Sequence, residues 1–190
     1  MDYRARLFLA AASLIAGMAI SGCVPVPRRY QSALDHERSP DWDNTALNVL
    51  IEKYGPPDRI EPKRVVWERK GPWKRIAVWD EMDYLQISRD ADNIEETIAY
   101  LVPESKRKAV ENFNKRLKVS PGVAELSARS ASEERNFLAL NLADEVIQGI
   151  RTPEAAKDFY DLTIKLANAG KSSPYMQGLH FQPPRPAAAP

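Results

Sequence analysis

Proline is distributed so unevenly along the 190-residue chain that it limits where a compact fold can form. Eight of the fifteen prolines lie in two terminal stretches, at Pro25, Pro27, Pro40, Pro174, Pro183, Pro184, Pro186 and Pro190. Proline fixes φ and lacks an amide proton, so such stretches favour extended chain over helices and sheets. We therefore expect one compact domain over residues 42–170, an extended tether over residues 23–41, and a Pro/Ala-rich tail over residues 171–190.

The composition is that of a globular protein and argues against several classes of function. Hydrophobic residues make up 44% of the chain, which suffices for a core, and the formal net charge of +1 supplies no field to attract nucleic acid. The chain has one Cys and two His, and His36 and His180 both fall in the terminal stretches. A lone Cys forms no internal disulfide, and a middle without His disfavours His-dependent catalysis. The sequence therefore predicts no metal, no cofactor and no nucleic-acid partner.

The first 22 residues have the order of an export signal. Arg4 and Arg6 precede an uncharged stretch at residues 7–20, which is shorter than the about 20 apolar residues that a membrane span needs. Small residues and then a cysteine follow this stretch, as Ser21, Gly22 and Cys23. An ordinary signal peptide with a coincidental cysteine is the alternative interpretation of this order.

The four residues Ile20, Ser21, Gly22 and Cys23 resemble the lipobox of bacterial lipoproteins. That resemblance implies cleavage between Gly22 and Cys23, followed by acylation of Cys23 with a diacylglycerol and usually an N-terminal acyl chain such as palmitate. Several acyl chains give a stable membrane anchor. Val24 is compatible with delivery to the outer membrane, facing the periplasm, if the host is Gram-negative. The expected location is the cell envelope, with membrane lipid as the first partner.

Residues 43–80 predict a helix followed by a β-hairpin. A capping Asp or Asn at positions 43–44 and the sequence GPP at residues 55–57 bound the helix. Two β-branched and aromatic stretches, residues 64–70 and 73–80, flank a Gly-Pro turn. This turn sets three cross-strand pairs: Trp67 with Ile76, Val65 with Val78, and Glu68 with Arg75, the last as an ion pair. Residues 84–88 are a possible third strand.

The second half of the domain is expected to be helical. It begins with a short apolar segment at residues 94–101 and a surface helix at residues 105–117, and residues 123–129 fit either a strand or an approach to the next helix. Apolar spacing, capping residues and glycines predict a final helical hairpin from residues 132–148 and 153–169. The predicted fold class is α+β: a small antiparallel hairpin or sheet packed with several helices.

Four tryptophans, Trp42, Trp67, Trp73 and Trp79, are close together in the sequence. The hairpin register places Trp67 toward the core and places Trp73, Arg75 and Trp79 on the opposite face. If helices cover one face only, these three residues form an exposed candidate binding patch, since aromatic side chains accept sugars or apolar side chains. If both faces are covered, all four tryptophans belong to the core.

Other polar clusters do not match a known site pattern. The acidic residues Asp80, Glu81, Asp83, Asp90 and Asp92 lack the spacing of a calcium-binding EF-hand and are interpreted as a solvated loop. Ser127, Ser130 and Ser132 lack the Gly-x-Ser-x-Gly turn of a nucleophilic serine. We interpret these serines as helix-capping residues.

Two further resemblances concern the folded part. The order of helix, LIEKYGPPD, Trp67 strand, turn and strand over residues 43–80 is similar to the SmpA/OmlA lipoproteins of outer-membrane assembly. That family's usual Gly-Met-Thr-like helix start is missing, and residues 94–170 have no counterpart there. The segments YGPPDR, GPWKRI and ERNFLALNLADEVI resemble a family of uncharacterised bacterial lipoproteins. This second resemblance implies lipidation and a common fold and supplies no site residues.

Two function classes follow from the sequence. The first is a lipid-anchored, non-catalytic binding or assembly module of the envelope, whose partner is another envelope protein or a cell-wall component. The second is an envelope hydrolase that uses a carboxylate pair, either Asp80 with Asp83 or Glu133 with Glu134. The hydrolase requires a concave site that holds both carboxylates and shifts at least one pKa.

Overall fold

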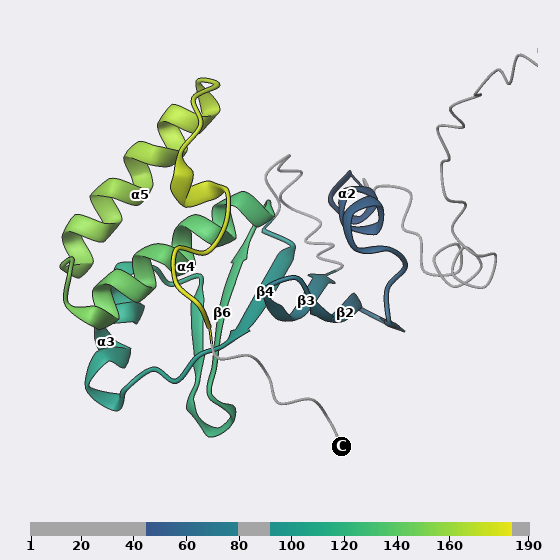
Figure 1. Cartoon of the computed structure of the whole chain (residues 1–190), viewed down its shortest axis with the longest axis horizontal. Helices are drawn as coiled ribbons and strands as arrows, with labels where there is room; N and C mark the ends of the chain where they lie inside the picture. The colour runs from purple at the N-terminus through teal and green to yellow at the C-terminus, as the bar shows by residue number, and fades with distance from the viewer. Residues whose placement is uncertain (1–44, 80–91, 184–190) are drawn as a thin grey trace, which may run out of the picture.

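The computed structural model describes residues 45–79 and 92–183, which form an α+β fold (Figure 1). In chain order its elements are α2 (Thr45–Tyr54), β1 (Arg59–Glu61), β2 (Arg64–Lys70), β3 (Trp73–Trp79), β4 (Ile94–Ala99), α3 (Glu104–Phe113), β5 (Leu117–Ser120), the 3-10 turn η1 (Pro121–Val123), β6 (Glu125–Ser130), α4 (Glu133–Gln148), α5 (Pro153–Asn168) and the 3-10 turn η2 (Pro174–Met176). The predicted fold class is confirmed.

Six strands form one antiparallel sheet in the order β1-β2-β3-β4-β6-β5. Strands β2 and β3 form the predicted hairpin with the predicted register, because Trp67 lies opposite Ile76 and Val65 lies opposite Val78. Both edge strands are short, with 3 residues in β1 and 4 in β5. Short edges limit unwanted pairing with other chains.

The predicted ion pair between Glu68 and Arg75 is wrong, although the two residues lie opposite each other. Arg75 instead contacts Glu125 of β6, with 3.2 Å between Nη2 and Oε2, and Glu68 contacts Arg59 of β1 at 2.9 Å. Glu68 reaches diagonally to the neighbouring strand β1, whereas the long side chain of Arg75 reaches across β4 to β6, which is not adjacent to β3. The hairpin alone therefore did not determine these partners.

The assignment of residues 94–101 to a helical half is also wrong, because Ile94–Ala99 is strand β4 and pairs with β3 and β6. A short apolar stretch does not by itself distinguish a strand from a helix. The β-branched side chains of Ile94, Thr97 and Ile98 favour the strand. The possible strand at residues 84–88 lies outside the described residues.

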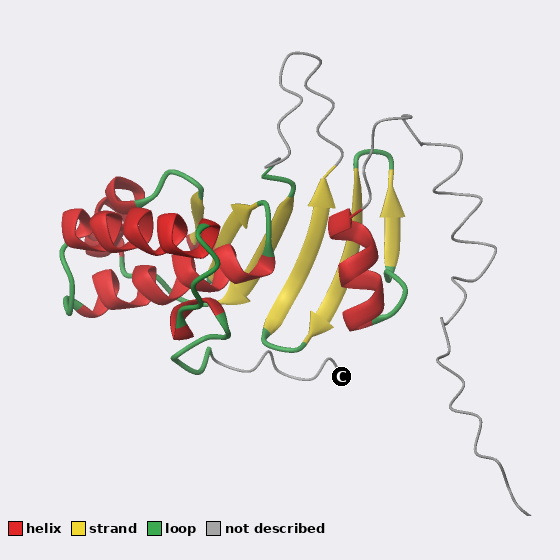
Figure 2. Ribbon diagram, turned by 90° about the horizontal axis from the view of Figure 1, so that it is seen from above, coloured by secondary structure: helices red, strands yellow, loops and turns green. Residues whose placement is uncertain are grey.

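The described helices build a core on one face of the sheet. Helices α3, α4 and α5 group at one end and α2 lies at the other, near β2 and β3 (Figure 2). The strands contribute to this core the side chains on one face of the sheet: Val65, Trp67, Ile76, Val78, Ile94, Ile98, Leu126 and Ala128. Val66 and Ala77 lie on the opposite face of the sheet and are buried outside this core.

The predicted C-terminal helical hairpin is present as α4 and α5. The Ser132 hydroxyl caps α4 by accepting a hydrogen bond from the Arg135 amide, and Gly149 ends the helix in the left-handed region at φ 76°. The Thr152 hydroxyl caps α5 in the same way, and Pro153 occupies its first position. These local signals fix the helix ends because they satisfy backbone groups that lack intrahelical partners.

The compact part extends beyond residue 170, so the tail predicted from residue 171 begins too early. The side chain of Asn141 on α4 binds this segment, donating from Nδ2 to the carbonyls of Tyr175 at 3.0 Å and Gly178 at 2.8 Å. Its Oδ1 accepts from the His180 amide at 2.7 Å. Phe181 packs edge-on against Tyr100. Three hydrogen bonds from one buried amide therefore hold the segment against α4.

Within residues 45–79 and 92–183, no helix is long and apolar enough to cross a membrane. The expected cleavage and lipidation residues, Gly22 and Cys23, lie outside the described residues, as do the tether at residues 23–41 and Trp42. Their roles stay predictions.

Candidate functional site

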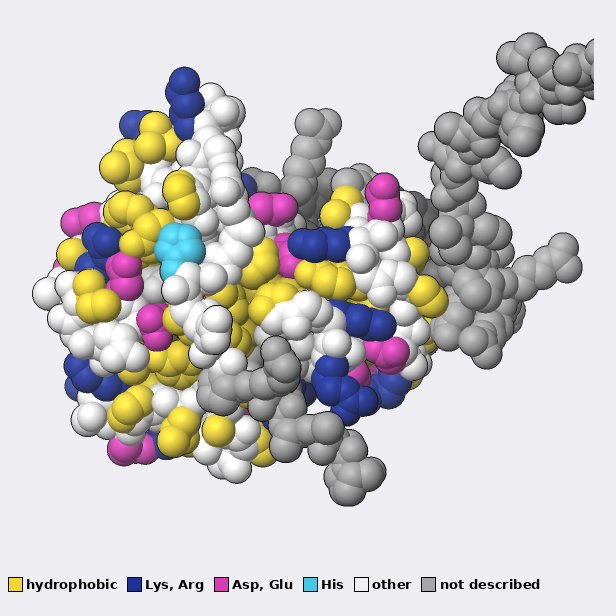
Figure 3. Space-filling model, viewed as in Figure 1, with side chains coloured by type: hydrophobic (Ala, Val, Ile, Leu, Met, Phe, Trp, Pro, Cys, Tyr) yellow, Lys and Arg dark blue, Asp and Glu magenta, His cyan; other side chains and the backbone are white. Residues whose placement is uncertain are grey.

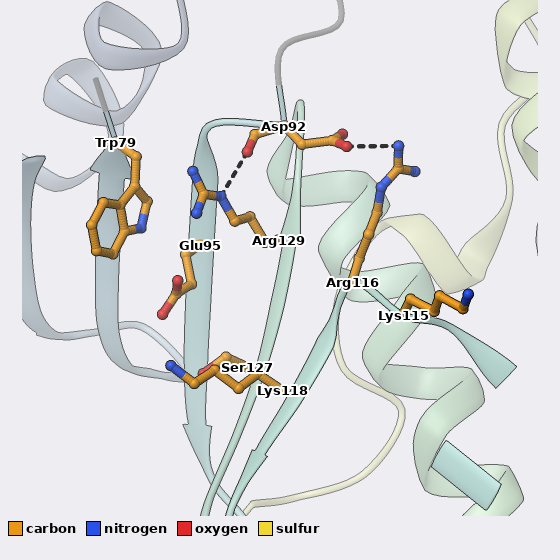
Figure 4. Close-up of a pocket in the computed structure, with 8 residues that line it drawn as sticks. All are labelled: Trp79, Asp92, Glu95, Lys115, Arg116, Lys118, Ser127 and Arg129. Carbon is orange, nitrogen blue, oxygen red and sulfur yellow. Dashed lines mark hydrogen bonds and ion pairs between the residues drawn. The ribbon is translucent and has the colours of Figure 1, made fainter. Parts of the chain in front are cut away.

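A shallow groove of about 470 Å³ crosses the sheet on the face opposite the helical core (Figure 4). It is lined by Trp79, Asp92, Glu95, Lys115, Arg116, Lys118, Ser127 and Arg129. The register explains why strands far apart in sequence contribute to it, since Glu95 lies opposite Arg129 and Lys118 lies opposite Ser127. Side chains on one face of adjacent strands are fixed by the sheet. The groove therefore has a rigid floor.

The indole of Trp79 contacts two guanidinium groups at this face. The Cζ atoms of Arg64 and Arg129 lie 4.9 and 5.1 Å from its ring centroid. Guanidinium groups are attracted to aromatic faces by about 0.5–1 kcal/mol at exposed sites. The indole nitrogen is buried and has no hydrogen-bond partner in the described structure. Trp79 thus positions cations beside the groove instead of offering a free ring for a sugar.

Asp92 fixes the upper rim of the groove. Its backbone carbonyl accepts a hydrogen bond from Arg129 Nε at 2.8 Å, and its carboxylate lies 2.6 Å from Arg116 Nη2 (Figure 4). One residue therefore joins the approach to β4, strand β6 and the turn before β5. This contact orders the side chains of Arg116 and Arg129 before any ligand arrives.

The lining of the groove is positively charged on balance, with four cationic side chains and two carboxylates. Lys115 and Lys118 are exposed, and neither they nor Glu95 form an ion pair within the described part of the chain. The Ser127 hydroxyl lies 2.9 Å from that of Thr97 and is only 4% exposed, so it belongs to the floor. Available ammonium groups on a pre-ordered surface suit the binding of an anionic group.

The expectation that Trp73, Arg75 and Trp79 form one exposed patch is wrong. Trp73 is 2% exposed, stacks on Phe137 of α4 at 4.9 Å between centroids, and thus belongs to the core. Trp73 is the first residue of β3, beside the hairpin turn, and its indole Nε1 donates a hydrogen bond to Glu133 at 2.8 Å. Arg75 forms an ion pair with Glu125. Only Trp79 of the three lines the groove.

A second polar cluster is enclosed where α2 meets the start of α4. Glu133 is 7% exposed, and its carboxylate accepts hydrogen bonds from Lys53 at 2.5 Å, from Trp73 Nε1 at 2.8 Å and from the Tyr54 hydroxyl. Burial, followed by the hydrogen bond to Glu133, raises the pKa of Tyr54 and keeps the phenol protonated. The cluster fastens α2 to α4.

Glu96 on β4 is a fully buried carboxyl group beside this cluster. Its Oε2 accepts from Asn136 Nδ2 at 3.0 Å, its Oε1 has no partner, and Asn136 in turn accepts from the Ser130 hydroxyl at 2.7 Å. Burial, and then the nearby charge of Glu133, raise the pKa of Glu96 well above its usual range. Glu96 is 0% exposed, so no ligand reaches it in this structure.

The carboxylate pairs considered for hydrolysis find no support in the described residues. Glu133 is engaged by Lys53, Tyr54 and Trp73, whereas Glu134 points outward and is exposed. The other pair, Asp80 with Asp83, lies outside the described residues together with Glu81 and Asp90. Within residues 45–79 and 92–183, no group of three or more His, Cys, Asp or Glu is arranged to hold a metal ion.

Most groove residues were missed from the sequence. The four cations of the lining are ordinary surface residues until the strand order brings them together, namely Lys115, Arg116, Lys118 and Arg129. The usable signal was the alternation in residues 125–130, ELSARS, where Leu126 and Ala128 enter the core while Ser127 and Arg129 line the groove. Two-residue periodicity predicts such a strand.

Comparison with known proteins gives no relative from which a role could be transferred. The chain matches no protein-family model, no curated protein and no solved structure among those compared. The lipobox and the SmpA/OmlA similarity therefore stay resemblances, and the site is interpreted from its own geometry.

Proposed function

We propose that this chain is a lipid-anchored cell-envelope protein that binds another envelope component and acts as a binding or assembly module, not as an enzyme. Its anchor is the acylated Cys23, and in a Gram-negative host the domain would face the periplasm from the outer membrane. The partner is an envelope protein or a cell-wall component. The proposal combines the lipobox resemblance with the groove on the open sheet face.

The observation that carries the binding role is the arrangement of ordered cations around Trp79. Arg64 and Arg129 lie against the indole, while Lys115 and Lys118 remain exposed along the same groove. Ordering charged side chains before binding reduces the entropy lost on association. Such a surface suits a partner that carries negative charge.

The hydrolase is the less supported alternative. Hydrolysis by two carboxyl groups requires that both reach the same bond. Glu133 is enclosed by its three donors and Glu134 is exposed on α4. The buried pair of Glu96 and Glu133 includes a raised pKa, yet Glu96 is inaccessible to a substrate.

The anchor is tested by mass spectrometry of the mature N-terminus from intact cells. We expect wild type to begin at a diacylglyceryl-modified Cys23 and Cys23→Ala to keep residues 1–22. An unmodified Cys23 in the wild-type protein would refute lipid anchoring and leave the groove hypothesis untouched.

The groove is tested by site-specific photo-crosslinking in intact cells. A photoreactive amino acid replaces Lys118 in the groove or, as the control, Lys157, which is exposed on α5 and paired with Asp161. We expect a discrete adduct from position 118 alone. The same adducts from both positions, or none from position 118, would contradict a binding role for this face.

A further inference from the structure

The outward side of α5 carries an apolar stripe in which Leu162 and Leu166 are exposed, while Phe159 is partly buried and packs on Tyr175. The stripe recurs at intervals of four and three residues, as Ala155, Phe159, Leu162, Leu166 and Ala169. Leu162 is 55% exposed and Leu166 is 45% exposed, while α5 enters the core through its other side. Figure 3 shows hydrophobic side chains gathering over the end of the molecule that α5 forms. Alternating intervals of four and three residues are those of a coiled-coil seam.

Two charged residues of opposite sign border the stripe on the same side. Asp158 immediately precedes Phe159, and Lys165 immediately precedes Leu166, seven residues further along. Seven residues are close to two helical turns, so both side chains leave α5 in nearly the same direction. Both residues are exposed, and neither forms an ion pair within the described part of the chain. The border therefore carries one negative and one positive charge that form no ion pair within the described residues.

We propose that this side of α5 binds the same side of α5 in a second copy of the chain, in antiparallel orientation around a twofold axis at Leu162. With a rise of 1.5 Å per residue, Asp158 lies about 6 Å before Leu162 and Lys165 about 4.5 Å after it. The twofold axis reverses the direction of the partner helix. Residues that flank the stripe on one side therefore face the residues on the same flank of the partner helix. Asp158 therefore meets Lys165 of the partner subunit, and the symmetry repeats this ion pair.

Charge matching distinguishes this arrangement from a parallel one. In a parallel pair, a residue at the position of Asp158 faces the residue five positions later in the partner, which is Thr163. Thr163 is 6% exposed and belongs to the core side of α5. A parallel pair would leave Asp158 and Lys165 without partners. In the antiparallel orientation the Leu162 side chains of the two copies meet, and Asp158 and Lys165 each face a residue of opposite charge.

Disulfide crosslinking tests the axis directly. The full-length chain carries Cys23→Ala, which removes its only cysteine, together with either Leu162→Cys on the axis or Lys157→Cys on the opposite flank of α5. Under mild oxidation we expect Leu162→Cys to yield a species of twice the chain mass at least about tenfold faster than Lys157→Cys. Equal rates from both positions, or no crosslink from position 162, would overturn the proposal.

Charge exchange tests the orientation by sedimentation equilibrium of the purified full-length protein. Asp158→Lys and Lys165→Asp each turn two attractive pairs into repulsive ones, and we expect each to weaken self-association at least about tenfold. The double variant, or an equimolar mixture of the two single variants, is expected to restore the wild-type constant. A wild-type protein that stays monomeric, or single variants without effect, would refute the pairing. Neither result bears on the groove.

Discussion

Replacing Glu96 by Gln should change how the stability of this protein depends on pH. Glu96 is fully buried with one oxygen lacking a partner, and burial raises its pKa well above the usual value of 4.5. Between pH 4.5 and the raised pKa, the unfolded chain releases a proton that the native state keeps. The free energy of unfolding must therefore fall as pH rises through this window, by about 1.4 kcal/mol per pH unit from this group alone.

Glutamine has nearly the same shape and its carbonyl can still accept the hydrogen bond from Asn136, but it carries no titrating proton. We expect Glu96→Gln and wild type to have similar stabilities near pH 4. The variant should then become relatively more stable by about 1.4 kcal/mol for each pH unit, up to the native pKa. Glu133, Lys53 and Glu134 also act electrostatically on Glu96, and they remain in both proteins.

Urea unfolding followed by tryptophan fluorescence measures this difference, because Trp67 and Trp73 are buried in the native state. Transitions recorded at half-unit steps from pH 4 to 8 give the slope for each protein. Glu111→Gln is the matched control, since its side chain is exposed on α3 and is not among the groups that act on Glu96, and it should keep the wild-type slope. Parallel curves for wild type and Glu96→Gln would mean that the buried carboxyl group is not held protonated, and would refute the reasoning.

Three further predictions use the same unfolding assay. Leu140→Ala removes a side chain of 0% exposure and should lower the free energy of unfolding by about 2–5 kcal/mol. Leu162→Ala at low protein concentration should lower it by less than about 0.5 kcal/mol, because this side chain is exposed. Equal losses would contradict the assigned core. Gly149→Ala places a β-carbon on a residue with φ 76° and should lower the free energy of unfolding by about 1–2 kcal/mol. Gly122→Ala is the control, because Gly122 has open space around it and no positive φ. An unchanged stability of Gly149→Ala would contradict the assigned end of α4. Ser132→Ala removes the α4 cap and should cost about 1 kcal/mol, largely recovered by Ser132→Asp.

The sequence was most informative where structure is determined by neighbouring residues. Ser132, Gly149 and Thr152 mark helix ends because each satisfies or redirects nearby backbone groups, and the Gly-Pro turn set the register of β2 and β3. Strand β4 was misassigned because its six residues are too few for a period to be resolved. Its neighbours β3 and β6 determine that it is a strand, and that pairing is not local.

The groove was less predictable than the fold because it depends on strand order. Arg129 follows Trp79 by fifty positions in the sequence, yet its guanidinium group lies against the indole because β4 and β6 continue the sheet beside β3. Trp73 illustrates the opposite error. Alternation along the strand placed it outward, whereas the Phe137 ring and the acceptor Glu133 hold its indole in the core. Contacts between distant segments decided both outcomes.

The two proposed surfaces lie on different sides of the molecule, and this separation has a physical consequence. Helix α5 packs on α3 and α4, which cover one face of the sheet, while the groove lies on the other face. Pairing through α5 would therefore leave both grooves open, and one dimer would present two of them. Two linked sites bind a partner with repeated negative charges more tightly than either site alone, because the second contact forms at a high effective concentration. A partner with repeated charges should thus lose affinity when Asp158→Lys breaks the dimer, while a partner with one charged group should not.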